Sequence, residues 1–405
     1  MHKLKIGIPI SFDYNPLAGG SYSYTKQLVK AIDTYEFKNN VEIVFLNFEK
    51  KDIKTQKPLI TFHPFSTYTF RDLIRKTSIQ LLKQLPFNLF KGLLKQQEER
   101  HSDARNKKIK AVLDENQVKV LFYLNPDGNT YNFPFLTIYW DIGHISTFMF
   151  PEFLEDFETR TEYYKNILPK ALIIITETEF GKEELIKYTN INPDRIEVMP
   201  IFPGEVIHEN IPLEVQQETL RNSNLAFKQF FLYPAQFWAH KNHTLLIDAF
   251  EEVLKKHPEL KLIFTGSDKG NLTYIQNYIK NKNLDNHIKT LGFVDNSDLF
   301  TYYKNAIALV MPTYLGPSNM PPLEAAFLNC PILISNIKGH RELLGEYPRY
   351  FEPWDMNALV EEMLNQIEEK NSRIFQNGNN FNINAALTAL EHIFSKAAII
   401  RKNWT

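Results

Sequence analysis

The segment from residue 311 to residue 335, MPTYLGPSNMPPLEAAFLNCPILIS, has the residue types that would hold a phosphate group. An apolar run ends at MPT, the loop YLGPSN follows, and Pro321-Pro322 should open a helix, because proline is favoured in a first turn. Loops that lead into a helix bind anions through their backbone amides and the helix dipole. Because proline has no N–H, the amides available for an anion are those of Ser318, Asn319, Met320 and Leu323.

Glu324 falls in the first turn of the same predicted helix. A carboxylate repels phosphate but accepts hydrogen bonds from hydroxyl groups. The loop and Glu324 together therefore indicate a site for a nucleoside diphosphate, with Glu324 on the ribose. The alternative is a capped helix in which Glu324 only faces the helix dipole. The motif alone favours neither interpretation.

Lys241, in the run His-Lys-Asn-His at 240–243, is the second candidate for phosphate binding. We expect it to open the helix TLLIDAFEEVLKKH, so that its ammonium and the helix dipole act on one anion. The alternative is a solvated lysine. A zinc site at His240 and His243 would need further ligands, and none lies nearby in the sequence. No Asp-x-Asp pair is present to hold a diphosphate through a divalent ion, so we expect metal-independent binding and no cofactor.

Gly19 and Gly20 follow the first apolar run, Leu4–Ile10. Two glycines let the backbone approach a ligand closely and leave unhindered amides, although an ordinary turn is the alternative. The chain has neither the glycine pattern of a dinucleotide fold nor that of a P-loop.

Asp141 and His144, in YWDIGHISTFMFPEF, come directly after another predicted strand. At the carboxyl end of a strand they would face a cleft, where His144 could bind a sugar hydroxyl or assist an acceptor. A structural hydrogen bond between the two residues is the alternative. Asp127, in NPDG, is interpreted as a turn residue.

The elements that must position these residues form two series in which short apolar strands alternate with longer amphipathic helices. A polar stretch with prolines separates them near residues 200–230. We predict two doubly wound parallel-sheet α/β domains, residues 1–203 and 204–389, with a cleft between the carboxyl ends of their sheets.

Composition narrows the class of protein. The 405 residues are 43% hydrophobic and 23% charged, which predicts globular domains. The net charge of −1 argues against a nucleic-acid binder, and the single cysteine, Cys330, excludes a disulfide framework. No signal sequence is recognised and no apolar run approaches the length of a membrane span, so we expect a cytoplasmic protein.

Residues 51–110 contain 14 Lys/Arg and 5 Asp/Glu, a net charge of +9, with phenylalanine and leucine interleaved. This pattern is compatible with a peripheral contact with an anionic membrane, at its inner face for a cytoplasmic protein, although the sequence alone favours the ordinary alternative. An ordinary amphipathic helix with solvated lysines is the alternative.

The ordered motifs together resemble the retaining family 4 glycosyltransferases, whose GT-B fold has two Rossmann-like domains. The resemblance covers most of the chain outside residues 45–118. It rests on the phosphate-loop segment above and on the blocks AGGSYSYTKQLVKAI, ALIIITETEFGKEELIKYTNINPDRIEVMP, FFLYPAQFWAHKNHTLLIDAF, KLIFTGSDKGN, IKTLGFVDNSDLFTYYKNA and NIKGHRELLGEYPRYFEPWDMNAL.

Three positions depart from the family pattern. Gly316 stands where the family usually has the first of two glutamates, Gln236 where it often has arginine, and Trp140 where histidine is usual. His240 could partly compensate for the missing arginine if it were protonated. With YPAQFW, GPSN and WDxGH present together, the chain resembles a subfamily of bacterial cell-surface polysaccharide enzymes.

The resemblance implies a retaining, hexosyltransferase-type enzyme that takes a sugar from a nucleoside diphosphate to a glycan or lipid-linked acceptor. The N-terminal domain would bind the acceptor, the C-terminal domain the donor, and residues 390–405 would cross back as a helix onto the first domain. Lys241, Glu324 and His144 are the expected catalytic residues. Donor contacts are expected from Gly19, Gly20, Gln236, Val294, Ser318, Asn319, Met320 and Leu323, and acceptor contacts from Asp141 and His144.

Two other classes stay open on the sequence. A GT-B phosphorylase or nucleotide-sugar epimerase could use the same cleft, although no second phosphate site is recognised. A non-catalytic GT-B scaffold would account for Gly316 and Gln236, while Lys241, Glu324 and the glycine pair argue against it.

Overall fold

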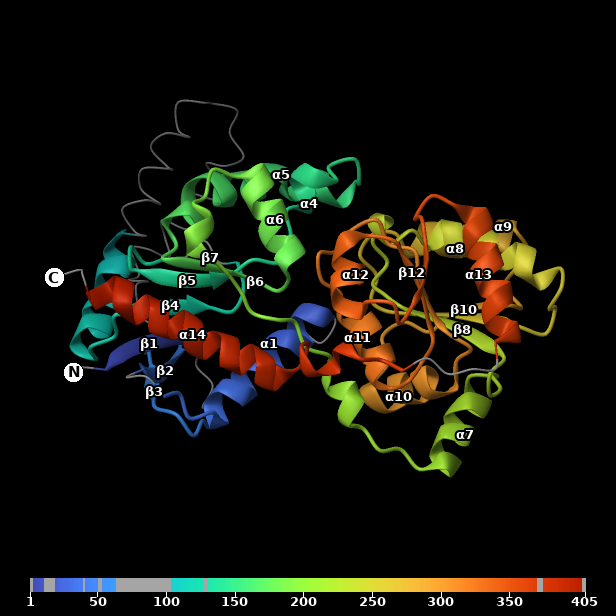
Figure 1. Ribbon diagram of the computed structural model, residues 1–405, viewed down its shortest axis with the longest axis horizontal. Helices are drawn as coiled ribbons and strands as arrows, with labels where there is room; N and C mark the ends of the chain where they lie inside the picture. The colour runs from blue at the N-terminus through green and yellow to red at the C-terminus, as the bar shows by residue number, and fades with distance from the viewer. Residues whose placement is uncertain are drawn as a thin grey trace, which may run out of the picture.

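The computed structural model describes residues 3–10, 19–38, 41–49, 53–62, 103–126, 130–369 and 374–402. Two α/β domains lie side by side along the long axis of the molecule (Figure 1). Each is built around one sheet, and every strand pair recorded in the two sheets is parallel. The predicted class of two doubly wound α/β domains is confirmed.

The N-terminal sheet has seven strands in the order β3-β2-β1-β4-β5-β6-β7. The strands are β1 (Leu4–Ile10), β2 (Val41–Asn47), β3 (Leu59–Thr61), β4 (Val120–Tyr123), β5 (Phe135–Ile138), β6 (Ile173–Thr176) and β7 (Ile196–Val198). The helices of this domain are α1 (Gly20–Thr34), residues 103–115, α4 (Gly143–Ser146), α5 (Glu152–Glu162) and α6 (Glu179–Tyr188), with a π-helical turn at Tyr163–Ile167.

Helices cover both faces of this sheet, which explains why its strands read as continuous apolar runs. In β4, Phe122 packs into the core shared with α1, whereas its neighbour Leu121 packs into a second core with the helix at 103–115. Successive strand residues point to opposite faces, so both must be apolar when both faces are covered.

The C-terminal sheet has six strands in the order β10-β9-β8-β11-β12-β13. They are β8 (Phe230–Pro234), β9 (Lys261–Thr265), β10 (Ile288–Thr290), β11 (Leu309–Met311), β12 (Ile332–Ser335) and β13 (Arg349–Phe351). The helices are α7 (Leu213–Asn222), α8 (His243–Leu254), α9 (Leu272–Asn281), α10 (Asn296–Asn305), α11 (Met320–Phe327), α12 (Lys338–Leu344) and α13 (Met356–Glu368). Every residue of the central strand β8 is buried.

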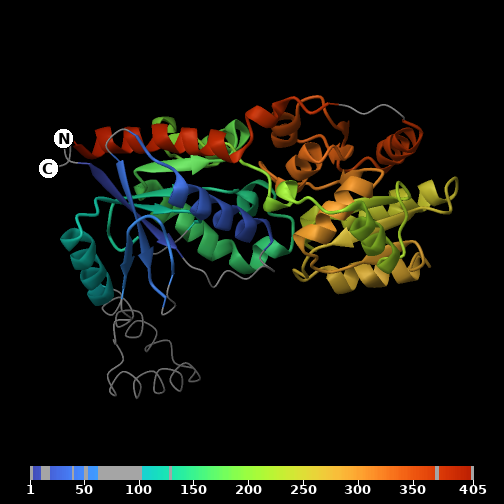
Figure 2. The ribbon, with the colours of Figure 1, turned by 90° about the horizontal axis from the view of Figure 1, so that it is seen from below.

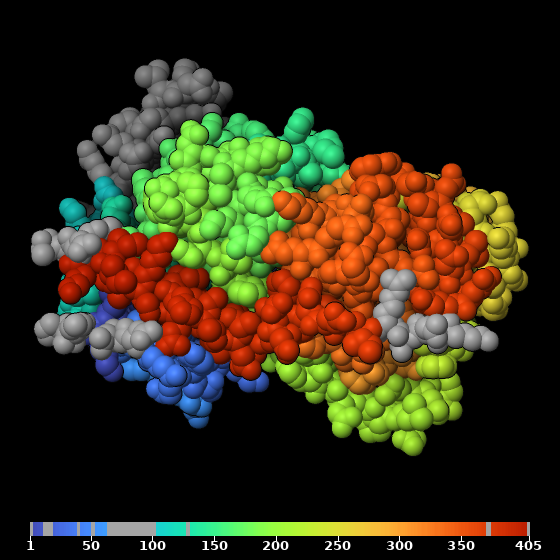
Figure 3. Space-filling model, in the orientation of Figure 1, coloured from blue at the N-terminus to red at the C-terminus, as the bar shows by residue number. Residues whose placement is uncertain are grey.

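The last helix, α14 (Ile383–Lys402), leaves the C-terminal domain and returns along the N-terminal one (Figure 2). It lies against α1 and β2 and runs across the surface of that domain (Figure 3). The fully buried Phe394 on α14 packs against Phe37 at 5.3 Å and Phe122 at 5.5 Å between ring centroids. The two domains are therefore connected twice, by the segment that joins β7 to α7 and by the segment that leads into α14.

Replacing Phe394 with alanine is expected to lower the free energy of unfolding by about 3–5 kcal/mol, because the large cavity left behind cannot fully collapse. Chemical denaturation followed by circular dichroism measures this loss. Ile399→Ala is the matched control in the same helix, since Ile399 is 69% exposed and its removal should cost little. Equal losses for the two variants would contradict the docking of α14 through Phe394.

Helix α14 is also long and apolar enough to cross a membrane by length and composition, a feature that the sequence analysis did not anticipate. Its apolar residues Leu387, Leu390 and Phe394 pack into the protein core. The basic segment predicted to contact a membrane lies largely outside the described residues, which include only 53–62 and 103–110 of it.

Candidate functional site

A cavity of about 770 Å³ lies between the two domains. The N-terminal domain contributes the first turn of α1 and the ends of β5 and β6. The C-terminal domain contributes the ends of β8, β9 and β11 and the start of α11. These are carboxyl ends of parallel strands, the edge where doubly wound folds bind ligands. The cavity therefore lies at the edge of both sheets where the sequence analysis placed the cleft.

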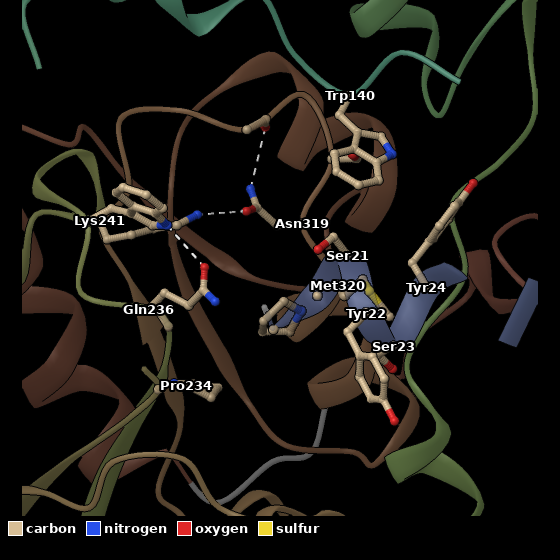
Figure 4. Close-up of a pocket in the computed structure, with 18 of the residues that line it drawn as sticks. Ser21, Tyr22, Ser23, Tyr24, Trp140, Pro234, Gln236, Lys241, Asn319 and Met320 are labelled. Atoms are coloured by element: carbon tan, nitrogen blue, oxygen red, sulfur yellow. Dashed lines mark hydrogen bonds between the residues drawn. The ribbon is translucent and has the colours of Figure 1, made fainter. Parts of the chain in front are cut away.

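Helix α11 begins at Met320, directly after the N-cap residue Asn319, with prolines at its first positions, as predicted. The Asn319 side chain makes no capping bond to its own helix. It turns toward β8 instead, where its Oδ1 accepts a hydrogen bond from Lys241 Nζ at 3.1 Å (Figure 4). The loop amides and a cation therefore meet at one point of the cavity wall.

Lys241 lies in a short 3-10 turn, Ala239–Lys241, which follows β8. The turn ends at Asn242, whose left-handed backbone (φ 58°) is held by side-chain hydrogen bonds to Pro312 O and Pro353 O. Tyr233 OH donates to the Lys241 carbonyl at 2.8 Å. Burial lowers the pKa of Lys241 to about 8, so the side chain is still mainly a cation at pH 7.

Lys241 does not open helix α8, which was the expectation from the sequence. Helix α8 begins two residues later, at His243, because Asn242 takes a left-handed conformation that no helix can contain. Lys241 therefore reaches the cavity from a turn. It brings a positive charge to the cavity wall but is not part of the first turn of α8.

Glu324 lines the cavity but is only 7% exposed. Its Oε1 accepts from the Gly204 N–H at 3.1 Å, and its Oε2 accepts from Tyr303 OH at 2.8 Å. Burial raises the pKa of this carboxyl. A carboxylate has about four acceptor positions, so ribose hydroxyls could still bind beside these two partners. Glu324 also fastens the segment between the domains, a role that the sequence did not indicate.

The glycine pair brings the N-terminal domain against the C-terminal one. Gly19 has a φ of 73°, and a Cβ there would lie 2.5 Å from Gln236 Nε2. A Cβ on Gly20 would lie 3.7 Å from Met320 Sδ. Gln236 in turn accepts from Trp238 Nε1 at 3.1 Å. Both glycines and Gln236 line the cavity, and their contact with a donor stays a prediction.

Asp141 and His144 are separated by the fold. Asp141 lines the cavity, and its Oδ1 accepts from the Gly143 N–H at 2.8 Å and from Arg160 Nη2 at 2.6 Å. His144 is fully buried and does not line the cavity; its ring lies against Tyr164, 4.8 Å between centroids. Burial lowers the pKa of His144 to about 4, which leaves the ring neutral. His144 therefore lies away from the cavity in which its contact with an acceptor was expected.

The other predicted donor residues fall into two groups. Val294, Ser318 and Met320 line the cavity, whereas Leu323 is fully buried and does not. The Ser318 hydroxyl donates to Glu177 Oε2 across the two domains. Burial raises the pKa of the Glu177 carboxyl to about 7.

Further contacts hold the domains together around the cavity. Glu342 of α12 accepts from the backbone N–H groups of Glu179 and Phe180, at 2.7 and 2.8 Å, at the start of α6. Glu152 Oε1 accepts from the His240 N–H at 3.0 Å and contacts its ring Nδ1 at 2.5 Å. Burial lowers the pKa of His240, so a compensating charge on this ring is not favoured.

His340 lies behind the cavity wall and was not among the residues predicted from the sequence. It is fully buried, and its Nε2 lies 2.9 Å from Asn319 Nδ2. The only signal was its place in the block NIKGHREL, which gives no hint that the ring turns inward. Among the described residues, no group of three or more His, Cys, Asp or Glu side chains could hold a metal ion.

Comparison with known proteins finds a family match within the C-terminal domain. Residues 216–381 match the family model described as glycosyl transferases group 1. The curated O-antigen chain mannosyltransferase B of Escherichia coli is 24% identical over 237 residues, which are 56% of this chain and 61% of that protein. The match therefore spans less than two thirds of the relative.

Two solved structures cover nearly the whole chain. A glycosyltransferase from Rickettsia africae superposes with a TM-score of 0.67 at 15% identity, covering all of both chains. Anabaena HepE in complex with UDP and glucose superposes with a TM-score of 0.64 at 13% identity, covering 97% of this chain and all of that one. These similarities show that the fold is GT-B.

Proposed function

Because residues 216–381 of this GT-B chain match the family model of group 1 glycosyl transferases, we propose that the protein is a retaining family 4 glycosyltransferase of bacterial surface polysaccharide synthesis. It would move a hexose from a nucleoside-diphosphate sugar to a glycan or lipid-linked acceptor at the cytoplasmic face of the membrane. One observation carries the proposal: Lys241 Nζ is fixed 3.1 Å from Asn319 Oδ1, beside the start of α11 in the interdomain cavity.

The donor fits the C-terminal side of the cavity. An anion at the start of α11 would meet the loop amides, the helix dipole and the Lys241 ammonium together. Lys269 lies further along the same wall, with its Nζ 5.9 Å from the Trp238 ring centroid. Anabaena HepE has the same fold and its structure contains UDP and glucose, which supports a nucleotide as the ligand of this chain. The diphosphate would bind without a metal ion.

The acceptor fits the N-terminal side. The charged residues that the described part of this domain gives to the cavity are Lys26, Asp141, Glu152, Asp156, Arg160 and Glu177. Acidic groups predominate, so a diphosphate is disfavoured there, whereas hydroxyl groups find acceptors. Trp140 and Tyr24 lie on the same side of the cavity (Figure 4). Trp140 offers an aromatic face at the position where the family that the sequence resembles usually has histidine.

In the proposed reaction, the bond between the sugar's anomeric carbon and the diphosphate oxygen breaks, and negative charge develops on the leaving group. Lys241 and the amides of the α11 loop stabilise that charge, which is the chief way in which such sites lower a barrier. An acceptor hydroxyl attacks the same face of the sugar and gives its proton to the departing phosphate. The configuration is retained, and no side chain acts as the nucleophile.

A thermal-shift panel with UDP, GDP, ADP, CDP and dTDP, with and without magnesium, tests the donor half of this proposal. One nucleotide at about 100 times its Kd should stabilise the fold by about 2.7 kcal/mol. For domains of this size that is a rise in Tm of roughly 5–11 °C. Omitting magnesium should leave the shift unchanged.

Product analysis with the matching nucleotide sugar then tests the reaction. Transfer to an acceptor with retained configuration is expected. A shift without sugar transfer would favour the non-catalytic scaffold, and turnover that required inorganic phosphate would favour a phosphorylase. No shift with any nucleotide would contradict the proposed donor.

A further inference from the structure

His340, in α12, is held so that only one of its ring nitrogens can carry a proton. Its Nδ1 lies 2.8 Å from the carbonyl oxygen of Ser335, an atom that can only accept. The Ser335 hydroxyl is committed elsewhere, because it donates to Thr313 O at 2.6 Å. Burial is the main cause that lowers the pKa of His340 to about 3, so the ring is neutral. The single proton therefore sits on Nδ1, and Nε2 is an acceptor.

The acceptor at His340 fixes the orientation of the Asn319 amide. Nδ2 of Asn319 lies 2.9 Å from His340 Nε2 and 3.5 Å from Gly316 O, two groups that need a donor. The NH2 end of the amide must face them, so Oδ1 must face Lys241 Nζ, 3.1 Å away. With the amide reversed, its NH2 protons would face the ammonium and all three hydrogen bonds would be lost.

We propose that His340 is a positioning residue: through the Asn319 amide, it holds the Lys241 ammonium at the cavity wall where an anionic ligand binds. The ring touches neither the cavity nor the ligand. A hydrogen-bond chain runs from Ser335 O through His340 and Asn319 to Lys241. In it, each group determines whether the facing atom of the next group must be a donor or an acceptor. The geometry of this hydrogen-bond chain is independent of the proposed function. Only the identity of the anion, a nucleoside diphosphate, rests on the proposed function.

This hydrogen-bond chain explains how the Lys241 ammonium can be held in place before any ligand binds. Lys241 carries four flexible side-chain bonds, and fixing such a side chain costs up to about 2 kcal/mol of conformational entropy. The hydrogen bond to Asn319 orders it in advance, so the ligand does not have to. The other titratable groups that act on Lys241 are Asp141 and Glu152, which favour its charge. Three neutral histidines, 240, 243 and 340, lie near it.

The test compares His340→Leu, which removes the acceptor, with His340→Gln, whose side-chain oxygen can replace it. His340→Leu is expected to raise the Kd of the nucleotide found in the panel by about 10-fold or more, the usual worth of a hydrogen bond to a charged group. His340→Gln should recover most of the affinity. In a Lys241→Met background, His340→Leu should change the Kd by less than about 2-fold, because the two residues act through one contact.

A second measurement needs no nucleotide. The rate at which an amine-reactive acetylating reagent modifies Lys241 is followed against pH, by mass spectrometry of its peptide. His340→Leu should lower the apparent pKa of this amine, because the Asn319 amide is no longer held with its oxygen toward the ammonium. A merely structural loss would lower Tm without moving this value.

His243→Leu is the matched control. His243 is a buried neutral histidine of the same domain whose ring nitrogens have no hydrogen-bond partner among the described residues. Its replacement should keep both the Kd and the Lys241 profile. An unchanged Lys241 profile in His340→Leu would overturn the proposal, as would an equal loss of affinity in the Lys241→Met background. If wild type binds none of the nucleotides, the proposed function fails, and the profile alone decides on His340.

Discussion

Lys241→Ala is expected to lower kcat/KM for the nucleotide sugar by about 10²–10³-fold, the usual cost of removing one group that stabilises a developing negative charge. Lys241 Nζ stands beside the start of α11, where the leaving diphosphate would gather that charge. Most of the loss should appear in kcat, because the charge is larger in the transition state than in the bound donor. Steady-state kinetics at pH 7 with saturating acceptor measures it.

The same lysine should set the basic limb of the pH profile. The pKa of Lys241 is lowered to about 8 in the absence of ligand. Since only the ammonium binds an anion well, nucleotide affinity should fall as pH rises through about 8, and Lys241→Ala should abolish that fall. Lys255→Ala is the control, because Lys255 lies at the exposed end of α8 and pairs with Glu252. Unchanged turnover in Lys241→Ala would contradict the proposed role.

The fold was predictable because the spacing of apolar residues agrees with their burial in the strands and helices that the structure describes. Apolar runs such as FFLYP can only be strands covered on both faces, and β8 is buried at all five positions. The proline pair that opens α11 also fixed where that helix begins. Such signals are local, so the sequence contains them in full.

The contents of the site were less predictable, because side-chain direction depends on contacts between distant segments. Asp141 and His144 are three residues apart, yet one lines the cavity and the other is buried beside Tyr164. Asn319 was expected to offer its amide, but its side chain also binds Lys241, 78 positions away. The partner of Asn319, His340, was missed for the same reason.

Gly316 shows how a departure from a family pattern can have a physical cause. Its φ is 137°, a conformation that is essentially restricted to glycine. A Cβ at this position would lie 2.2 Å from Asn319 Nδ2, inside contact distance. The Asn319 amide thus occupies the space that any side chain at 316 would need. The glutamate expected there from the resemblance is replaced by a different arrangement, in which Asn319 joins His340 to Lys241.

Gly316→Ala is therefore expected to lower turnover by about 10²-fold, the scale of loss caused by misplacing a reacting group by about 1 Å. The new methyl group displaces the Asn319 amide, so Lys241 loses its hydrogen bond. Gly316→Glu should do no better, although it restores the residue usual in the family. Backbone strain should also reduce the free energy of unfolding by about 1–3 kcal/mol.

Gly270→Ala separates the two effects. Gly270 also has a positive φ, 97°, but a Cβ there meets no atom within 4 Å. This variant should lose stability without losing turnover. In an Asn319→Ala background the collision at Gly316 is gone, so adding Gly316→Ala should lower turnover by no more than about 2-fold. A full loss in that background would mean that Gly316 acts through the backbone of the loop and not through the amide that holds Lys241.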